Sequence, residues 1–105
     1  MKVAFDIDDT LWKCTYPYNE KLGRKYLKQV PDYDLIQVVR WFAGNGDEVY
    51  FWSSGGTDYC QLIIGNLGLN DLGKVVVKGS IHPDIAFDDQ ETMLAKVDVQ
   101  VRREV

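Results

Sequence analysis

Near its start the chain reads Val3-Ala4-Phe5-Asp6-Ile7-Asp8-Asp9-Thr10-Leu11, an apolar run that leads directly into a cluster of acids. A short apolar run of this kind is typical of a buried strand, and Asp6 and Asp8 stand two positions apart where that strand should end. Carboxylates gathered at a strand end repel one another unless a cation or a reaction compensates their charge. The stretch therefore predicts an α/β fold with its chemistry at this strand end, and a divalent metal ion beside the acids.

The composition of the 105-residue chain, with 46% hydrophobic and 27% charged residues, predicts a single globular domain over residues 1–105. Its apolar runs are far shorter than the roughly 20 residues that span a bilayer, and the acidic Asp6 comes too early for a signal peptide. We therefore expect a soluble, cytoplasmic protein with no membrane partner. Cys14 and Cys60 lack the spacing of a metal site, and we expect both to be reduced thiols.

The formal net charge of −4 disfavours an extended electrostatic grip on nucleic acid, because phosphate contacts need clustered Lys and Arg. Local basic segments nevertheless leave nucleic acid open as a partner. Half of the 12 basic residues lie in two segments, the first with Lys21, Arg24, Lys25 and Lys28 and the second Arg102-Arg103. The simplest interpretation of both segments is a solvated surface.

Strand-like apolar runs alternate with helical patterns along the chain. Five segments are predicted as strands: Lys2–Ile7, Glu48–Trp52, Lys74–Val77, Asp84–Phe87 and Val97–Val101. The alternation predicts a three-layer α/β/α, Rossmann-like core, with a mainly parallel five-stranded sheet and helices on both of its faces. Ligands should then collect beyond the carboxyl ends of the strands.

Two stretches have the apolar periodicity of a helix. Over Tyr33–Ala43 the apolar stripe consists of Leu35, Val38, Val39 and Phe42. Asp32 or Asp34 is expected to cap the start of this helix, and Gly44-Asn45-Gly46 to end it. Over Asp58–Leu67 the stripe consists of Tyr59, Leu62, Ile63 and Leu67, with Gly68 as the stop.

Two other segments break the alternation. Residues Trp12–Pro31 contain Tyr16-Pro17-Tyr18 and a basic stretch, and they predict a flap lying over the end of the first strand. Trp12, Tyr16 and Tyr18 are candidates for the rim of the site. The link Lys78–Pro83 is too short to hold a crossover helix.

Four elements in order resemble the motifs of the haloacid dehalogenase superfamily of phosphatases and phosphotransferases. The first is Asp6-Ile7-Asp8-Asp9-Thr10, an Asp-x-Asp-x-Thr pattern after an apolar strand. The second is Glu48–Gly56, an apolar strand that ends in Ser53, and the fourth is Asp84–Asp89, an apolar strand that ends in paired acids. A lysine is expected between these two, and Lys78 or Lys74 fits. The resemblance extends from the first strand to Asp89, and it implies the fold and activity of that family.

The resemblance implies phosphoryl transfer. Asp6 would be the nucleophile that forms an aspartyl phosphate. Asp8 would be the general acid and base, for which its pKa should lie above the usual value of about 3.9. Ser53 would donate its hydroxyl to the phosphoryl oxygens. The substrate-binding residues would be Thr10, which braces the loop through the backbone or Asp8, and Ser54 and Gly55, which with Gly56 allow a close approach to the anion.

The same resemblance implies a magnesium site. Asp6, the backbone carbonyl of Asp8, and Asp88 would hold Mg²⁺, which prefers oxygen ligands. Asp89 would stand beside them and hold a water molecule or the lysine. Lys78 is preferred over Lys74 as the phosphate-binding lysine, because it directly follows the third strand and leads toward Asp88.

Most members of this superfamily insert a cap domain, whereas the gaps after Leu11 and after Ser53 are too short for one. The site should therefore be open, which suits a phosphorylated substrate that is large or presents its phosphate at an end. A sugar phosphate, a nucleotide, a nucleic-acid end and a phosphoprotein all remain open as substrates.

Two other functions compete with a phosphatase. A response-regulator receiver domain carries its acceptor acid after the third strand, whereas here that strand ends in Val77-Lys78. The alternative that stays open is a catalytically weak module of the same fold that binds phosphate or a protein. Intact Asp6 and Asp8 favour the enzyme.

Overall fold

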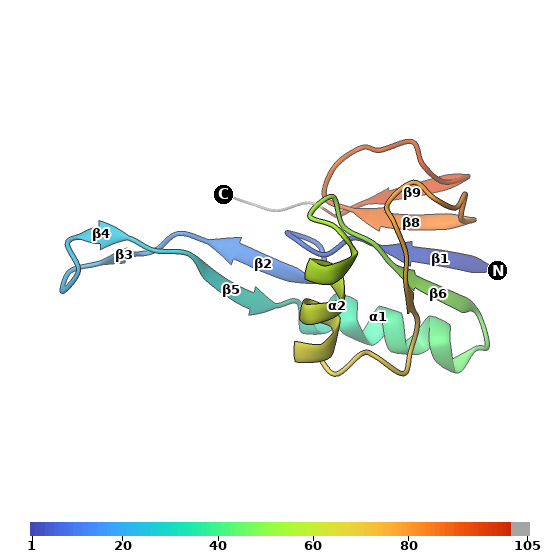
Figure 1. Ribbon diagram of the computed structural model, residues 1–105, viewed down its shortest axis with the longest axis horizontal. Helices are drawn as coiled ribbons and strands as arrows, with labels where there is room; N and C mark the ends of the chain where they lie inside the picture. Colours follow the sequence, from blue (N-terminus) through green and yellow to red (C-terminus); the bar gives the residue numbers. More distant parts are fainter. Residues whose placement is uncertain (102–105) are drawn as a thin grey trace.

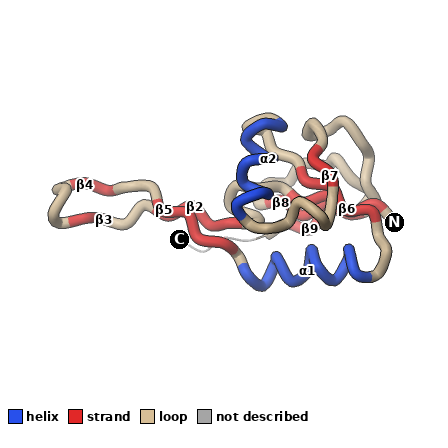
Figure 2. Tube along the Cα trace, turned by 60° about the horizontal axis from the view of Figure 1, so that its bottom comes forward, coloured by secondary structure: helices blue, strands red, loops and turns tan. Residues whose placement is uncertain are grey.

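The computed structural model describes residues 1–101, and its centre is a parallel sheet of five strands. The strands are β1 (Lys2–Phe5), β6 (Glu48–Phe51), β7 (Lys74–Val75), β8 (Ile85–Asp88) and β9 (Val97–Gln100); Figure 1 labels all of them except β7, which is labelled in Figure 2. Each coincides with one of the predicted strand segments, so the α/β class and the parallel sheet are confirmed. The basic pair Arg102-Arg103 lies outside the described residues.

The strand order β7-β6-β1-β8-β9 puts β1 at the centre of the sheet. This position explains its composition, because a central parallel strand is covered on both faces, and Val3, Ala4 and Phe5 are all fully buried. From β1 the chain first moves to β6 and β7, and it then crosses over to β8 on the other side of β1. The crevice where ligands collect in such sheets therefore lies at the carboxyl ends of β1 and β8.

The helices are α1 (Tyr33–Gly44) and α2 (Thr57–Asn66). The side chain of Asp32 caps α1 by accepting a hydrogen bond from the Leu35 N–H over 3.1 Å, which confirms one of the two expected caps. The helix ends before Gly46, whose positive φ of 83° only glycine adopts easily. The predicted stripe of α2 is partly wrong, because Leu62 is exposed and the neighbouring Ile64 is buried instead.

Both helices pack on the same face of the sheet. The side chains of Val3 and Phe5 on β1 join the buried side chains of both helices in one core cluster. The helices contribute Ile36, Val39 and Phe42 from α1 and Cys60, Ile63 and Ile64 from α2. A shallow pocket between Ile36 and Leu67 also shows that the two helices are neighbours.

The opposite face of the sheet carries no helix in the described chain, so the predicted three-layer arrangement is wrong. A smaller cluster of Ala4, Trp52 and Ala86 lies there. It is covered by irregular segments that contribute Val76, Ile81, Leu94 and Ala95. The links after β7 and β8 are too short for a helix, and small side chains on this face let them pack directly on the strands. The indole N–H of Trp52 is buried here without a partner among the described residues.

The segment between β1 and α1 forms a long hairpin, which we call the arm (residues 12–31). Strand β2 (Trp12–Thr15) pairs with β5 (Lys28–Pro31), and β3 (Tyr18–Asn19) pairs with β4 (Arg24–Lys25), both antiparallel. The arm extends away from the body of the protein, which gives the molecule a length of 48 Å against a width of 27 Å (Figures 1 and 2). The expectation of a flap lying over the strand end is therefore wrong, because only the base of the arm borders the site.

Two further expectations concern the two cysteines and membrane-spanning helices. Cys14 and Cys60 are free thiols, as predicted. Within residues 1–101, no helix has the length and apolar character needed to cross a membrane.

Candidate active site

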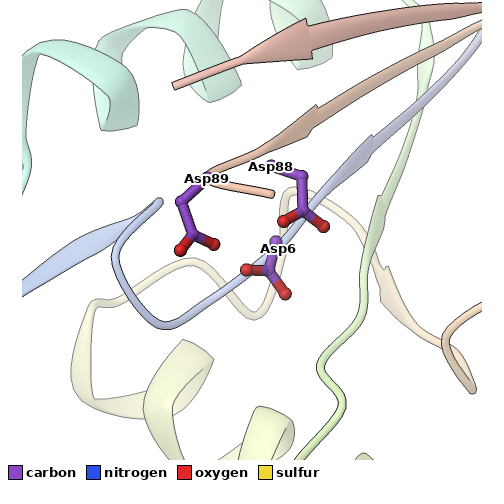
Figure 3. Close-up of side chains that lie close together, drawn as sticks. All are labelled: Asp6, Asp88 and Asp89. Carbon is purple, nitrogen blue, oxygen red and sulfur yellow. The ribbon is translucent and has the colours of Figure 1, made fainter. Parts of the chain in front are cut away.

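Three carboxylates converge at the carboxyl ends of the adjacent strands β1 and β8. Asp6 follows β1, Asp88 ends β8, and Asp89 comes next, and oxygens of all three lie within 4.8 Å of one another. Figure 3 shows the three side chains turned toward a shared space. Asp6 and Asp88 are only 6% and 3% exposed. Carboxylates buried this closely need a cation nearby.

Lys78 supplies one such cation. Its Nζ lies 2.7 Å from Asp88 Oδ2 and 3.2 Å from Asp6 Oδ1. Lys74, the other lysine considered from the sequence, lies within β7 and is exposed. The structure thus brings Lys78 to the acids, and Lys74 lies away from them among the residues of a different pocket.

The pKa values of Asp6 and Lys78 are both shifted by burial and by the neighbouring charges. The pKa of Asp6 is raised from 3.8 to about 7, by burial first and by the charge of Asp88 second, while Lys78 opposes both. Burial lowers the pKa of Lys78, but its hydrogen bond to Asp88 and the charges of the two acids outweigh burial and raise it overall. One lysine therefore does not neutralise the three carboxylates.

Thr10 joins the first and fourth motifs. Its hydroxyl donates to Asp6 Oδ2 over 3.3 Å, and it accepts a hydrogen bond from the backbone N–H of Asp89 over 3.1 Å. The expected bond to the backbone is therefore confirmed, at the Asp89 N–H, and the bond to Asp6 was not expected. Thr10 is fully buried, so it fixes the position of the nucleophile candidate and is not exposed to a substrate.

The Asp8 carboxylate is held separately from the acid cluster. Its Oδ1 accepts a hydrogen bond from the hydroxyl of Tyr59 over 2.6 Å and another from the indole N–H of Trp12 over 2.9 Å. Tyr59 comes from α2 and Trp12 from the base of the arm, so two elements orient this one side chain. Asp8 is absent from the group of converging carboxylates, which leaves only its backbone carbonyl for a metal.

The turn that carries these acids has a strained residue. Asp9 has a φ of 58°, in the left-handed region that Asp tolerates better than most residues. Its Oδ1 accepts a hydrogen bond from the backbone N–H of Cys14 over 3.0 Å. This hydrogen bond connects the turn to β2, so that the acid-bearing turn and the base of the arm lie side by side.

The Ser53-Ser54-Gly55-Gly56 turn faces the acids from the end of β6. Ser53 is buried, and its Oγ accepts a hydrogen bond from the Gly55 N–H over 3.0 Å, which leaves its own proton to donate. A Cβ on Gly55 would lie 3.0 Å from Cδ2 of Tyr59, so glycine keeps this turn close to α2. Gly56 has a φ of 98° directly before α2.

A polar cavity of about 200 Å³ lies over the carboxyl ends of the strands. Its lining includes Asp6, Asp8, Ser53, Ser54, Lys78 and Asp88. Gly55 lies outside it, in the lining of a wider groove of about 700 Å³ between α2 and the base of the arm. The two spaces share Asp8 and Asp9, so they lie side by side.

Comparisons with protein-family models, with curated proteins and with solved structures found no match.

The donor set of the acid cluster fits a hard divalent cation. The three carboxylates of Asp6, Asp88 and Asp89 offer only oxygen, and no described His or Cys lies in the group. Mg²⁺ prefers such ligands and keeps several of its own water molecules, so it does not need a full protein cage. These three residues could therefore hold Mg²⁺, with Lys78 beside them.

Sequence reasoning missed the role of Tyr59. The residue was assigned only to the apolar stripe of its helix, whereas its hydroxyl orients Asp8. Trp12 was expected at the rim, but it is mostly buried and donates to the same carboxylate. An aromatic residue with a polar atom at the first turn of a helix was the only available signal.

Proposed function

We propose that the chain is a Mg²⁺-dependent phosphohydrolase of the haloacid dehalogenase type, which works through an aspartyl phosphate. The observation that carries the proposal is the separation of two carboxylates from one loop. Asp6 is buried against Lys78 and the acid cluster, while Asp8 is oriented by Tyr59 and Trp12 and borders the same cavity. Two acids in such different surroundings are suited to different chemical tasks.

In the first step, a carboxylate oxygen of Asp6 attacks the phosphorus of a phosphomonoester. The bond from phosphorus to the leaving oxygen breaks, and protonated Asp8 gives its proton to that oxygen. Thr10 and Lys78 hold the Asp6 carboxylate in place for in-line attack. The products are an alcohol and an aspartyl phosphate on Asp6.

In the second step, Asp8 is now the base. It takes a proton from a water molecule, which attacks the phosphorus and displaces the Asp6 carboxylate. Inorganic phosphate leaves, Asp6 is restored as a carboxylate, and Asp8 is again protonated. The hydrogen bonds from Trp12 and Tyr59 both go to Oδ1 of Asp8, and no described residue bonds to Oδ2, which is the atom suited to exchange the proton.

Several groups around the cavity would stabilise the negative charge of the transferring phosphoryl group. The Ser53 hydroxyl and the Lys78 ammonium both line the cavity and would bind phosphoryl oxygens. Mg²⁺ held by Asp6, Asp88 and Asp89 would add positive charge beside the same oxygens. Without it, the carboxylates would repel a phosphate dianion.

The test is phosphate release from a generic aryl phosphate, with Mg²⁺ and with chelator. Asp6→Asn and Asp8→Asn should each lower kcat by about 100-fold or more. Asp34→Asn, a change of an exposed acid on α1, is the matched control and should keep full activity. If the unchanged protein releases no more phosphate than Asp6→Asn on any of a panel of natural phosphates, the binding-module alternative replaces the enzyme.

Metal binding can be measured separately from turnover. Mg²⁺ at a hundred times its Kd should stabilise the folded protein by about 2.7 kcal/mol. Asp88→Asn should abolish most of this stabilisation, and Asp98→Asn on the exposed β9 should not. Equal responses of both variants to Mg²⁺ would mean that the acid cluster is not the metal site.

A further inference from the structure

The arm has a surface that folding does not explain. Tyr16 and Tyr18 are 64% and 62% exposed, and Leu22 and Leu27 are also more than half exposed. No element of the described chain covers them, because the arm extends away from the body (Figure 2). Exposed aromatic and aliphatic side chains gathered on one projecting element are typical of a binding surface.

The arm is also the basic part of an acidic chain. Residues 12–31 contain five Lys or Arg and one Glu, whereas the remaining chain has seven basic and 15 acidic residues. The five basic residues are Lys13, Lys21, Arg24, Lys25 and Lys28, and all are exposed. A polyanion would therefore be attracted to the arm and repelled by most of the rest of the surface.

Strand pairing shows which arm residues face the site. Cys14 pairs with Gln29, and both line the 700 Å³ groove beside Asp8. Tyr16 and Leu27, the next residues of the same face, line it as well. Farther out, Tyr18 pairs with Lys25. Between the two strand pairs, the Tyr26 N–H donates to the Pro17 carbonyl over 3.1 Å, so the β3–β4 pair continues the register of the β2–β5 pair.

The groove thus continues the catalytic cavity along the arm. Tyr16 and Tyr18 lie two residues apart, which corresponds to about 6.7 Å along a strand. A substrate whose phosphate lies at Asp6 would extend past Asp8 and Tyr16 toward Tyr18 and Lys25. Because no cap closes over this path, the substrate can be much longer than the cavity.

We infer that the arm binds a single-stranded nucleic acid and presents its phosphorylated end to the acid cluster. This inference rests on the proposed phosphohydrolase function and names its substrate class. Base stacking on exposed tyrosines together with phosphate contacts to Lys and Arg is how proteins hold single strands without sequence preference. An acidic phosphopeptide would use the basic residues but would leave the row of tyrosines without a partner.

The binding test uses the whole chain carrying Asp6→Asn, so that a bound substrate is not hydrolysed. Fluorescence anisotropy is measured with a labelled single-stranded oligonucleotide of about 12 nucleotides, phosphorylated at one end, in Mg²⁺. In this background, Tyr16→Ala with Tyr18→Ala should raise Kd at least about fivefold, because stacking is lost. Arg24→Ala with Lys25→Ala should raise Kd and lower the slope of log Kd against log salt by up to about 1.4.

The matched control removes the same charges elsewhere, by Arg40→Ala with Lys74→Ala, both exposed on the body. It should bind the oligonucleotide as the parent does. Equal weakening in the control and the arm variant would overturn the inference, because binding would then follow net charge alone. A Kd unchanged by both arm variants would overturn it too.

Turnover separates this inference from the proposed function. Arg24→Ala with Lys25→Ala, in β4 at the far end of the arm, should hydrolyse a small aryl phosphate normally but a phosphorylated oligonucleotide at least about fivefold less efficiently. Turnover of the aryl phosphate without any oligonucleotide binding overturns the inference and leaves the phosphohydrolase. Arm-dependent oligonucleotide binding without turnover of any phosphate overturns the phosphohydrolase and supports the arm as a nucleic-acid surface. Binding to a phosphopeptide or to anionic vesicles, with no binding to the oligonucleotide, also overturns the inference that the arm binds nucleic acid.

Discussion

Tyr59 on α2 donates its hydroxyl to Oδ1 of Asp8 over 2.6 Å, although 51 residues separate them. Burial, and after it the bond to Asp8, raise the pKa of Tyr59 to about 12, so the hydroxyl keeps its proton throughout the neutral range. The Tyr59 hydroxyl therefore remains a hydrogen-bond donor to Asp8 throughout this range. This contact connects the position of the second helix with the orientation of the candidate acid and base.

Tyr59→Phe should lower kcat on an aryl phosphate by about tenfold, because a misplaced general acid transfers its proton less well. The KM should change little, since the substitution leaves Ser53 and Lys78, the proposed phosphate-binding residues, in place. Trp12 still donates to Asp8, which limits the loss. Tyr33→Phe, on the exposed side of α1, is the control. A kcat equal to that of the control would show that Tyr59 does not position Asp8.

Gly73 tests how closely β6 and β7 approach each other. A Cβ at this position would lie 2.6 Å from the backbone oxygen of Val49 and 2.9 Å from Cε2 of Phe51. Since a backbone oxygen moves only with its strand, Gly73→Ala should lower the free energy of unfolding by about 1–3 kcal/mol. Gly44→Ala at the end of α1 meets nothing within 4 Å and should raise it by about 0.5 kcal/mol. Urea unfolding measures both, and similar values would contradict this packing.

The strands and helices could be predicted because their signals are local. Apolar runs mark β1, β6 and β8, and an aspartate with an apolar stripe marks α1. The layer arrangement required a further step. Right-handed crossovers in one direction, from β1 to β6 and on to β7, place both helices on the same face. The short link after β7 then excludes a helix on the other face. Its length is evident from the sequence, but the expectation of three layers did not take its consequence into account.

The acids of the candidate site could be predicted because they lie where apolar strands end: Asp6 directly follows β1, and Asp88 is the last residue of β8. The contacts that orient them could not. Thr10 bonds to Asp6 and to the Asp89 N–H, and Tyr59 bonds to Asp8, and each depends on how distant elements pack. The arm was mistaken for a flap because the sequence of residues 12–31 does not show in which direction this segment extends from the body. Its strand pairing and its direction are both visible only in the structure.

Lys78→Met should destabilise the fold when no metal is bound. Lys78 lies between two buried carboxylates, at 3.2 Å from Asp6 and 2.7 Å from Asp88, and its removal leaves both without a cation. The free energy of unfolding at pH 8 in chelator should fall by about 3 kcal/mol. The loss should be smaller at pH 5, because the pKa of Asp6 is about 7 and the acid is then mostly protonated.

Lys74→Met on the exposed edge of the sheet is the control, and it should change the free energy of unfolding by less than about 0.5 kcal/mol. Saturating Mg²⁺ should restore part of the stability lost in Lys78→Met. An equal, small effect of both substitutions at pH 8 would mean that Lys78 does not compensate the acids.

Asp6 should make the metal-free protein less stable as the pH rises. Its pKa is raised from 3.8 to about 7 by burial and by the charge of Asp88. Below pH 3.8 the folded and unfolded chains both hold this proton, so Asp6 has no effect there. Between about pH 4 and pH 7 the unfolded chain ionises first, the folded chain binds more protons, and the free energy of unfolding therefore falls. Above about pH 7 both forms are ionised and the penalty is constant.

Asp6→Asn removes this titration, so the variant should be more stable than the parent by about 1 kcal/mol or more at pH 8 in chelator, and no more stable at pH 3.5. Its Asn side chain can still accept a hydrogen bond from Lys78 or Thr10, because the amide oxygen remains. Urea unfolding at several pH values measures the difference. Adding Mg²⁺ should reverse the order at pH 8, since the cation stabilises the ionised parent and not the amide. A stability difference that does not change between pH 4 and pH 8 would show that Asp6 is already ionised in the folded protein at low pH.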